Sequence, residues 1–200
     1  MKLGALWRRT TGAGAGAADG DDAATLATPG ATRLLFVCMG NICRSPTAEG
    51  VMRAKLRAAG LHRRVVVDSA GMIDHHRGEP PDPRAIRHAA QRGYDLSALR
   101  ARRVDPIDFQ RFHWMLAMDE DNLDWLRRQA PAGSPARLQL LLDHGPPGGP
   151  REVPDPYYGS PAGFEHVLDL VEAACDGLVA LLAARAGVPG GDTGGGPVPS

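Results

Sequence analysis

The sequence has few cysteines, few aromatic residues and no excess of charge of either sign. Its three cysteines are too few for a disulfide framework, so we expect a reducing compartment and place the protein in the cytoplasm. The 23 lysines and arginines balance the 23 aspartates and glutamates. No overall field therefore favours nucleic acid or an acidic membrane as a partner, and any anion site must be local.

Long hydrophobic runs are also missing. No stretch reaches the roughly 18 apolar residues that a transmembrane helix needs, so we expect no membrane partner. Residues 1–31 and 187–200 are rich in small residues and proline and show no periodicity. We expect a disordered N-terminal extension and a disordered C-terminal tail there, and one folded domain over residues 32–186.

Within that domain, apolar runs alternate with stretches of helical periodicity. The alternation predicts a parallel sheet with helices on both faces, in which ligands bind beyond the carboxyl ends of the strands. We expect strands over residues 33–38, 65–67, 112–118 and 137–142, and helices over residues 45–60, 83–93, 121–129 and 162–186.

The segment from Cys38 to Ser45 lies between the first predicted strand and the first predicted helix. Its backbone N–H groups can converge on an anion there, and the N-terminus of the helix favours a thiolate at Cys38. Arg44 follows Cys38 by six residues and offers a planar fork for two phosphate oxygens. Gly40 permits close backbone approach, and Asn41 tolerates the left-handed conformation that such a loop requires.

Two separated motifs resemble one known family. Leu35-Phe-Val-Cys-Met-Gly-Asn-Ile-Cys-Arg-Ser-Pro-Thr-Ala-Glu49 is similar to the signature of the low-molecular-weight protein tyrosine phosphatases. Asp155-Pro-Tyr-Tyr-Gly159 resembles the acid loop of that family. The segments 68–71, 78–84 and 118–123 between them are also similar, so the resemblance spans roughly residues 33–184.

The resemblance implies a flavodoxin-like, three-layer α/β fold with a four-stranded parallel sheet. It also implies a two-step hydrolysis of phosphotyrosine that needs no metal and no cofactor. Cys38 would be the nucleophile and form a phosphocysteine, Arg44 would bind the phosphate, and Asp155 would be the general acid. The partner would be a phosphotyrosine-containing protein, and the enzyme a monomer or a weakly self-associating one.

By the same resemblance, a second group of residues would surround the substrate. The Ser45 hydroxyl would steady the thiolate, Asn41 would fix the loop together with Ser69, and two tyrosines would stack on the substrate ring. The substrate-binding residues would be Met39, Gly40, Asn41, Ile42, Cys43, Ser45, His75, Tyr157 and Tyr158.

The sequence departs from the family pattern at two positions and leaves one residue open. His75 stands where an aromatic side chain is usual, and Leu99 stands where a histidine often supports the Asn41 network. Cys43 is either a packing residue or the partner of Cys38 in a reversible disulfide. Cys175, on the apolar stripe of the last predicted helix, is expected in the core.

Three rival functions remain. A phosphoarginine phosphatase would use the same scaffold, but relatives with that preference tend to carry threonine at the position of Ile42. The apolar Ile42 favours an aromatic ring over a buried guanidinium. A thiol-dependent arsenate reductase would need further cysteines, and none lies between Cys43 and Cys175. A silent phosphotyrosine-binding module would not need Cys38, Arg44 and Asp155 together.

Overall fold

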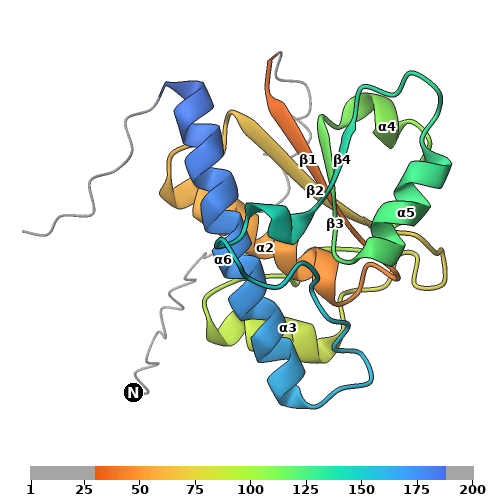
Figure 1. The fold of residues 1–200 in the computed structure, drawn as a ribbon. Coiled ribbons are helices and arrows are strands. Elements are labelled where there is room, and N and C mark those ends of the chain that lie inside the picture. Colours follow the sequence, from red (N-terminus) through yellow and green to blue (C-terminus); the bar gives the residue numbers. More distant parts are fainter. Residues whose placement is uncertain (1–29, 188–200) are drawn as a thin grey trace, which may run out of the picture.

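The computed structural model describes residues 30–187 and has a parallel sheet at its centre (Figure 1). The strands pair in the order β2-β1-β3-β4, so β1 is flanked on both sides. This arrangement confirms the predicted four-stranded parallel sheet. The strands are β1 (Thr32–Cys38), β2 (Val65–Gly71), β3 (Trp114–Ala117) and β4 (Arg137–Leu140).

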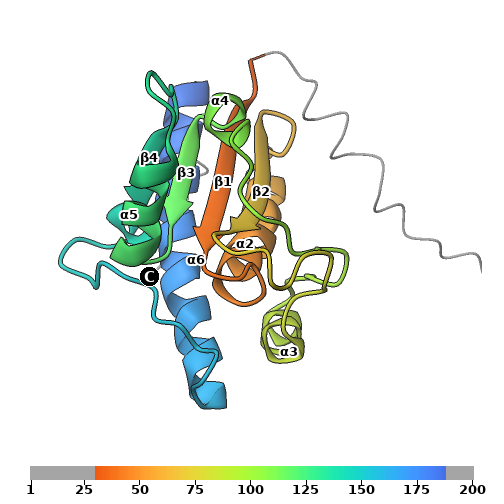
Figure 2. The ribbon, with the colours of Figure 1, turned by 90° about the vertical axis from the view of Figure 1, so that its right-hand side faces the viewer.

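Helices cover both faces of this sheet (Figure 2). The helices are α2 (Arg44–Ala58), α3 (Pro83–Gln91), α4 (Asp108–Arg111), α5 (Glu120–Gln129), α6 (Pro161–Ala186) and the 3-10 helix η1 (Leu141–His144). On one face α2 and α6 pack against the strands, and on the other α4 and α5 do so. The predicted three-layer fold is therefore confirmed, and no described helix is long and apolar enough to cross a membrane.

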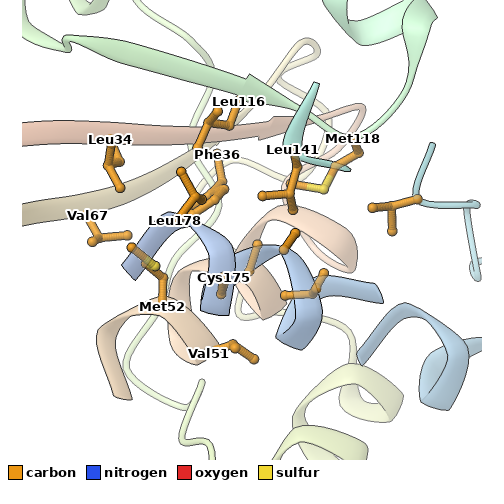
Figure 3. Close-up of a cluster of buried hydrophobic side chains, with 14 of the residues drawn as sticks. Leu34, Phe36, Val51, Met52, Val67, Leu116, Met118, Leu141, Cys175 and Leu178 are labelled. Carbon is orange, nitrogen blue, oxygen red and sulfur yellow. The ribbon is translucent and has the colours of Figure 1, made fainter. Parts of the chain in front are cut away.

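The alternation of side chains along β1 builds a core on each face of the sheet. Leu34 and Phe36 join the cluster beneath α2 and α6 (Figure 3), whereas Leu35 and Val37 join the cluster beneath α4 and α5. All four side chains are fully buried. Successive residues of a strand point to opposite faces, so a continuous apolar run is what a strand covered on both faces requires.

Helix α6 closes the first of these cores along one stripe. Val167, Val171, Ala174, Leu178 and Leu182 are buried as the periodicity predicted. Cys175 is also buried in this cluster, which confirms its expected place in the core. Leu170 and Leu181 of the same helix pack only partly buried against the cluster.

Element boundaries show where local sequence was a poor guide. The strand expected over residues 137–142 ends at Leu140, because Asp143 accepts a hydrogen bond from Leu140 N and the chain turns into η1. The expected strand over residues 65–67 continues to Gly71, and helix α4 was missed. The predicted disordered segments lie outside the described residues except for Gly30, Ala31 and Gly187.

Gly177 of α6 should be intolerant of any side chain. A Cβ atom there would lie 2.0 Å from the carbonyl oxygen of His144, a backbone atom that cannot rotate away. We expect Gly177→Ala to lower the free energy of unfolding by about 1–3 kcal/mol or more, measured by urea denaturation. Gly163→Ala in the same helix is the matched control, since its Cβ would meet Pro156 at 3.6 Å. Equal midpoints for the two variants would contradict this packing argument.

Candidate active site

The Cys38 thiol lies where β1 ends and the loop to α2 begins. Its side chain is buried, and its sulfur receives a hydrogen bond from Asn41 N at 3.3 Å. The Ser45 hydroxyl, in the first turn of α2, lies 3.0 Å from the same sulfur. The sulfur therefore lies at the N-terminus of α2 with two polar neighbours.

Asn41 holds the loop in shape. Its φ angle is 56°, the left-handed conformation expected from the sequence. Its side-chain Nδ2 donates to Ser45 Oγ and to Ser69 Oγ, each at 2.9 Å, and its Oδ1 accepts from Arg102 N at 2.9 Å. The predicted contact with Ser69 is thus present. Leu99 takes no part in it and packs against the buried cluster under α2 and α6.

Sequence reasoning gave no role to Glu49, a buried acid behind the loop. Its Oε2 accepts from Ser69 Oγ at 2.5 Å, and its Oε1 pairs with Arg53 Nη2 at 2.7 Å. Burial raises the pKa of Glu49 to about 7, although the charge of Arg53 lowers it; Asp68 adds to the rise. The sequence did contain a signal for Glu49: it lies beside the apolar positions of the helix and four residues before Arg53.

Arg44 is held by two carboxylates from distant parts of the chain. Its Nη1 donates to Asp119 Oδ2 at 2.5 Å and to Val153 O at 3.2 Å, and its Nη2 donates to Asp155 Oδ2 at 2.7 Å. Burial lowers the pKa of Arg44, but the charges of Cys38, Asp155 and Asp119 outweigh burial and raise it. The buried Nε has no partner among the described residues.

Asp119 is the second residue that sequence reasoning missed. It caps α5 through Oδ1, which accepts from Asn122 N at 2.7 Å, and it holds Arg44 through Oδ2. It lies two residues after β3, at the edge of the sheet where parallel sheets bind ligands. That position, within a segment already similar to the family, was the signal.

Gly71 is the third missed residue. Because it has no side chain, the loop after Cys38 can lie close against the end of β2. A Cβ atom there would lie 2.9 Å from Met39 O and 3.2 Å from Asn41 N. Backbone hydrogen bonds from Met72 N to Cys38 O and from Ile73 N to Met39 O then fix this contact. Only glycine leaves room for the loop backbone at this point.

The predicted site residues gather around one cleft of about 270 Å³. All of them line it except Asn41 and Ser45, which are buried beneath it. The cleft is also lined by Ile73 and His76, two residues that the sequence analysis did not assign to the site. The lining is Cys38, Met39, Gly40, Ile42, Cys43, Arg44, Ile73, His75, His76, Asp155, Tyr157 and Tyr158.

A larger cleft of about 630 Å³ lies beside α4 and α5, but it is lined by no cysteine and no histidine. Among residues 30–187, no group of three or more His, Cys, Asp or Glu could hold a metal ion.

Cys43 is packed rather than exposed on its loop. It forms a small buried cluster with Ala85 and Phe164, against which Ile42 packs. Burial raises the pKa of its thiol, and the charge of Asp82 adds to the rise. Both Cys38 and Cys43 are free thiols in this structure. Cys43 therefore has a packing role, and its disulfide with Cys38 stays a prediction.

A thiol at the end of a central parallel strand, lining one cleft with an arginine and an acid, is the arrangement of cysteine-dependent phosphatases. The family model described as low molecular weight phosphotyrosine protein phosphatase matches residues 33–187. The chain belongs to this family.

Individual relatives agree in sequence and in fold. The low molecular weight protein-tyrosine-phosphatase of Streptomyces coelicolor is 46% identical over 153 residues, which cover 75% of this chain and 93% of the relative. A protein tyrosine phosphatase from Entamoeba histolytica, crystallised with Hepes in the active site, is 36% identical with a TM-score of 0.72. That match covers 78% of this chain and 99% of the other. The structure of DARP, a drosophila arginine phosphatase, is 28% identical with a TM-score of 0.71. That match covers 74% of this chain and 96% of DARP.

The buried charge of Glu49 should make stability depend on pH. The folded protein binds this proton with a pKa of about 7, against an ordinary value of 4.5. The contribution of this group to the free energy of unfolding is therefore fully present below about pH 4.5. About 3 kcal/mol of it is lost as the pH rises through 7. Glu49→Gln cannot titrate, so its free energy of unfolding should rise relative to the natural protein between about pH 5 and pH 8.

The measurement is urea unfolding at both pH values, with Asp121→Asn as the control. Asp121 is an exposed acid at the start of α5. A difference between Glu49→Gln and the natural protein that is the same at both pH values would overturn the assignment of a raised pKa to Glu49.

Proposed function

We propose that this chain hydrolyses phosphotyrosine on proteins, with Cys38 as nucleophile, Arg44 as phosphate ligand and Asp155 as general acid. The observation that carries the proposal is the meeting of these residues in one cleft. Arg44 Nη2 lies 2.7 Å from Asp155 Oδ2, although the two residues are 111 positions apart. Cys38 opens into the same cleft from the end of β1.

The phosphate would bind over the loop between Cys38 and Arg44. The buried Nε of Arg44 has no protein partner among the described residues, and an oxyanion is the acceptor that this donor fits. The N-terminus of α2 adds positive potential at the same place. Phosphate oxygens would compete with Asp155 for Nη2 of Arg44, which frees Asp155 to face the leaving group.

In the first step, the Cys38 sulfur attacks phosphorus and the bond from phosphorus to the tyrosyl oxygen breaks. Asp155, protonated, gives its proton to that oxygen, so tyrosine leaves neutral. Arg44 binds the equatorial oxygens of the transition state with its planar fork. The product of this step is a phosphocysteine at Cys38.

In the second step, water attacks phosphorus and the bond from sulfur to phosphorus breaks. The Asp155 carboxylate now accepts the proton of the attacking water, and inorganic phosphate is released. The sulfur leaves as a thiolate, which the hydroxyl of Ser45 stabilises from 3.0 Å and Asn41 N from 3.3 Å.

Apolar and aromatic side chains support an aryl substrate. Ile42 lines the cleft beside Tyr157 and Tyr158, whose rings meet edge to face at 4.8 Å. Met39 is half-exposed at the same opening and, like the tyrosine rings, offers apolar surface to a substrate ring. His75 lines the wall where the family usually has an aromatic side chain, so that wall is smaller and more polar here.

The second candidate substrate is phosphoarginine. DARP, with a closely similar fold, is an arginine phosphatase. A guanidinium at the position of the substrate ring would need hydrogen-bond acceptors, which the side chain of Ile42 cannot supply. We therefore place phosphotyrosine first.

We also propose a cytoplasmic location, because the mechanism needs the reduced thiol of Cys38.

Cys38→Ser should abolish release of phosphate from a phosphotyrosine peptide. A hydroxyl is a far weaker nucleophile than a thiolate, so activity should fall to the background of a chelator-containing assay. The same assay with phosphoarginine tests the second candidate. If only phosphoarginine is turned over, the substrate is phosphoarginine and not phosphotyrosine. If Cys38→Ser releases phosphate as fast as the natural protein, Cys38 is not the nucleophile.

Asp155→Asn should lower kcat by about 10² to 10⁴ on phosphotyrosine, because the leaving tyrosyl oxygen then receives no proton. The loss should be much smaller on p-nitrophenyl phosphate, whose leaving group departs without a proton. Glu152→Gln, an exposed acid in the same segment, is the control. Equal losses on the two substrates would mean that Asp155 is not the general acid.

A further inference from the structure

Arg84, near the start of α3, lies between two aromatic rings. The centre of its guanidinium is 4.8 Å from the ring centroid of Phe164 and 5.6 Å from that of Tyr157. Phe164 is buried at the start of α6, whereas Tyr157 belongs to the segment that carries Asp155. Figure 1 shows α3 beside the first half of α6, which brings these segments together. Arg84 thus contacts both the core and the wall of the cleft.

Asp82 fixes the orientation of this guanidinium. Its Oδ1 accepts from Arg84 Nε at 3.0 Å and its Oδ2 accepts from Arg84 Nη2 at 2.8 Å, a two-point contact that sets the plane of the group. Hydrogen bonds from Arg84 lower the pKa of Asp82, so the pair stays ionic. Asp82 N also donates to Ile42 O at 2.8 Å, which connects the pair to the phosphate loop.

Tyr157 is a partly exposed residue of the cleft wall. Its side chain is 38% exposed, and its other ring contact is with Tyr158, which is 97% exposed. Its backbone N–H donates to Asp155 Oδ1 at 3.1 Å, so the position of Tyr157 is also linked to that of the acid. The cation–π contact with Arg84 therefore ties the Tyr157 ring to α3.

We propose that Arg84 is a positioning residue that holds the Tyr157 ring as one wall of the cleft, at a distance set by the contact of Asp82 with Ile42. The wall then selects phosphate groups that carry an aromatic ring. This inference rests on the proposed function, since it concerns how the same cleft distinguishes substrates. A purely structural role, holding the Asp82 side chain that caps the start of α3, is the alternative to be separated from it.

Binding of two phosphonates tests the proposal without requiring turnover. Benzylphosphonate carries a ring and methylphosphonate does not, so the ratio of their Kd values, measured by calorimetry, reports the ring wall alone. Arg84→Met should lower the preference for benzylphosphonate about three- to fivefold, from the usual strength of a cation–π contact. Its affinity for methylphosphonate should change less than about twofold, because the phosphate loop is not altered.

Two further variants separate positioning from helix capping. Arg87→Met removes an exposed positive charge from the same helix and should leave the preference unchanged. Tyr157→Leu should itself lower the preference, and adding Arg84→Met to it should have no further effect. A fall in the double variant beyond Tyr157→Leu alone, or an unchanged preference in Arg84→Met, would overturn the proposal.

Folding and function are checked in the same samples. If Arg84→Met does not fold, Arg84→Gln decides the question by the same criteria. Turnover of a phosphotyrosine peptide by the natural protein is measured alongside. If the natural protein shows no turnover but prefers benzylphosphonate, and Arg84→Met lowers that preference, the proposed function is rejected and the role of Arg84 stands. If turnover is normal and Arg84→Met leaves the preference unaltered, only the role of Arg84 is rejected.

Discussion

The amide of Asn41 is the constraint on which the site depends. A loop that turns through a left-handed residue would be costly to hold by its backbone alone. Three hydrogen bonds from one side chain join the loop to α2 through Ser45, to β2 through Ser69, and to the segment after α3 through Arg102 N. The sulfur of Cys38 and the guanidinium of Arg44 are placed relative to each other because this loop has one shape.

Glu49 gives that network a direction. The ionised carboxylate only accepts, so the single hydroxyl hydrogen of Ser69 goes to Glu49, and Ser69 Oγ accepts from Asn41. The second hydrogen of the Asn41 amide goes to Ser45 Oγ, so the Ser45 hydroxyl hydrogen is left for Cys38 Sγ at 3.0 Å or for Ala70 O at 3.4 Å, of which the sulfur is the nearer. Above the Glu49 pKa of about 7, a buried charge that destabilises the fold thereby orders the donors around the Cys38 sulfur.

The spacing of residues placed the local parts of the site, and the family resemblance supplied distant members such as Asp155 and Ser69. Neither assigned a role to Glu49, Asp119 or Gly71. The loop from Cys38 to Ser45 follows one strand and opens one helix, so its residues are placed by their spacing alone. The roles of Glu49, Asp119 and Gly71 come from contacts with residues at least 20 positions away. Periodicity marks an acid on a helix as a surface residue, whereas its burial depends on β2 packing over it.

The two carboxylates on Arg44 differ in how firmly the fold holds them. Asp119 caps α5 and has 22% of its side chain exposed, whereas Asp155 follows a long loop and has 44% exposed. A phosphate arriving over the loop would displace the partner that costs less to move, which is Asp155. Asp119 would keep its contact with Nη1 and maintain the plane of the guanidinium. The same competition that binds phosphate would therefore release the acid toward the leaving group, so substrate binding and proton delivery are coupled through one arginine.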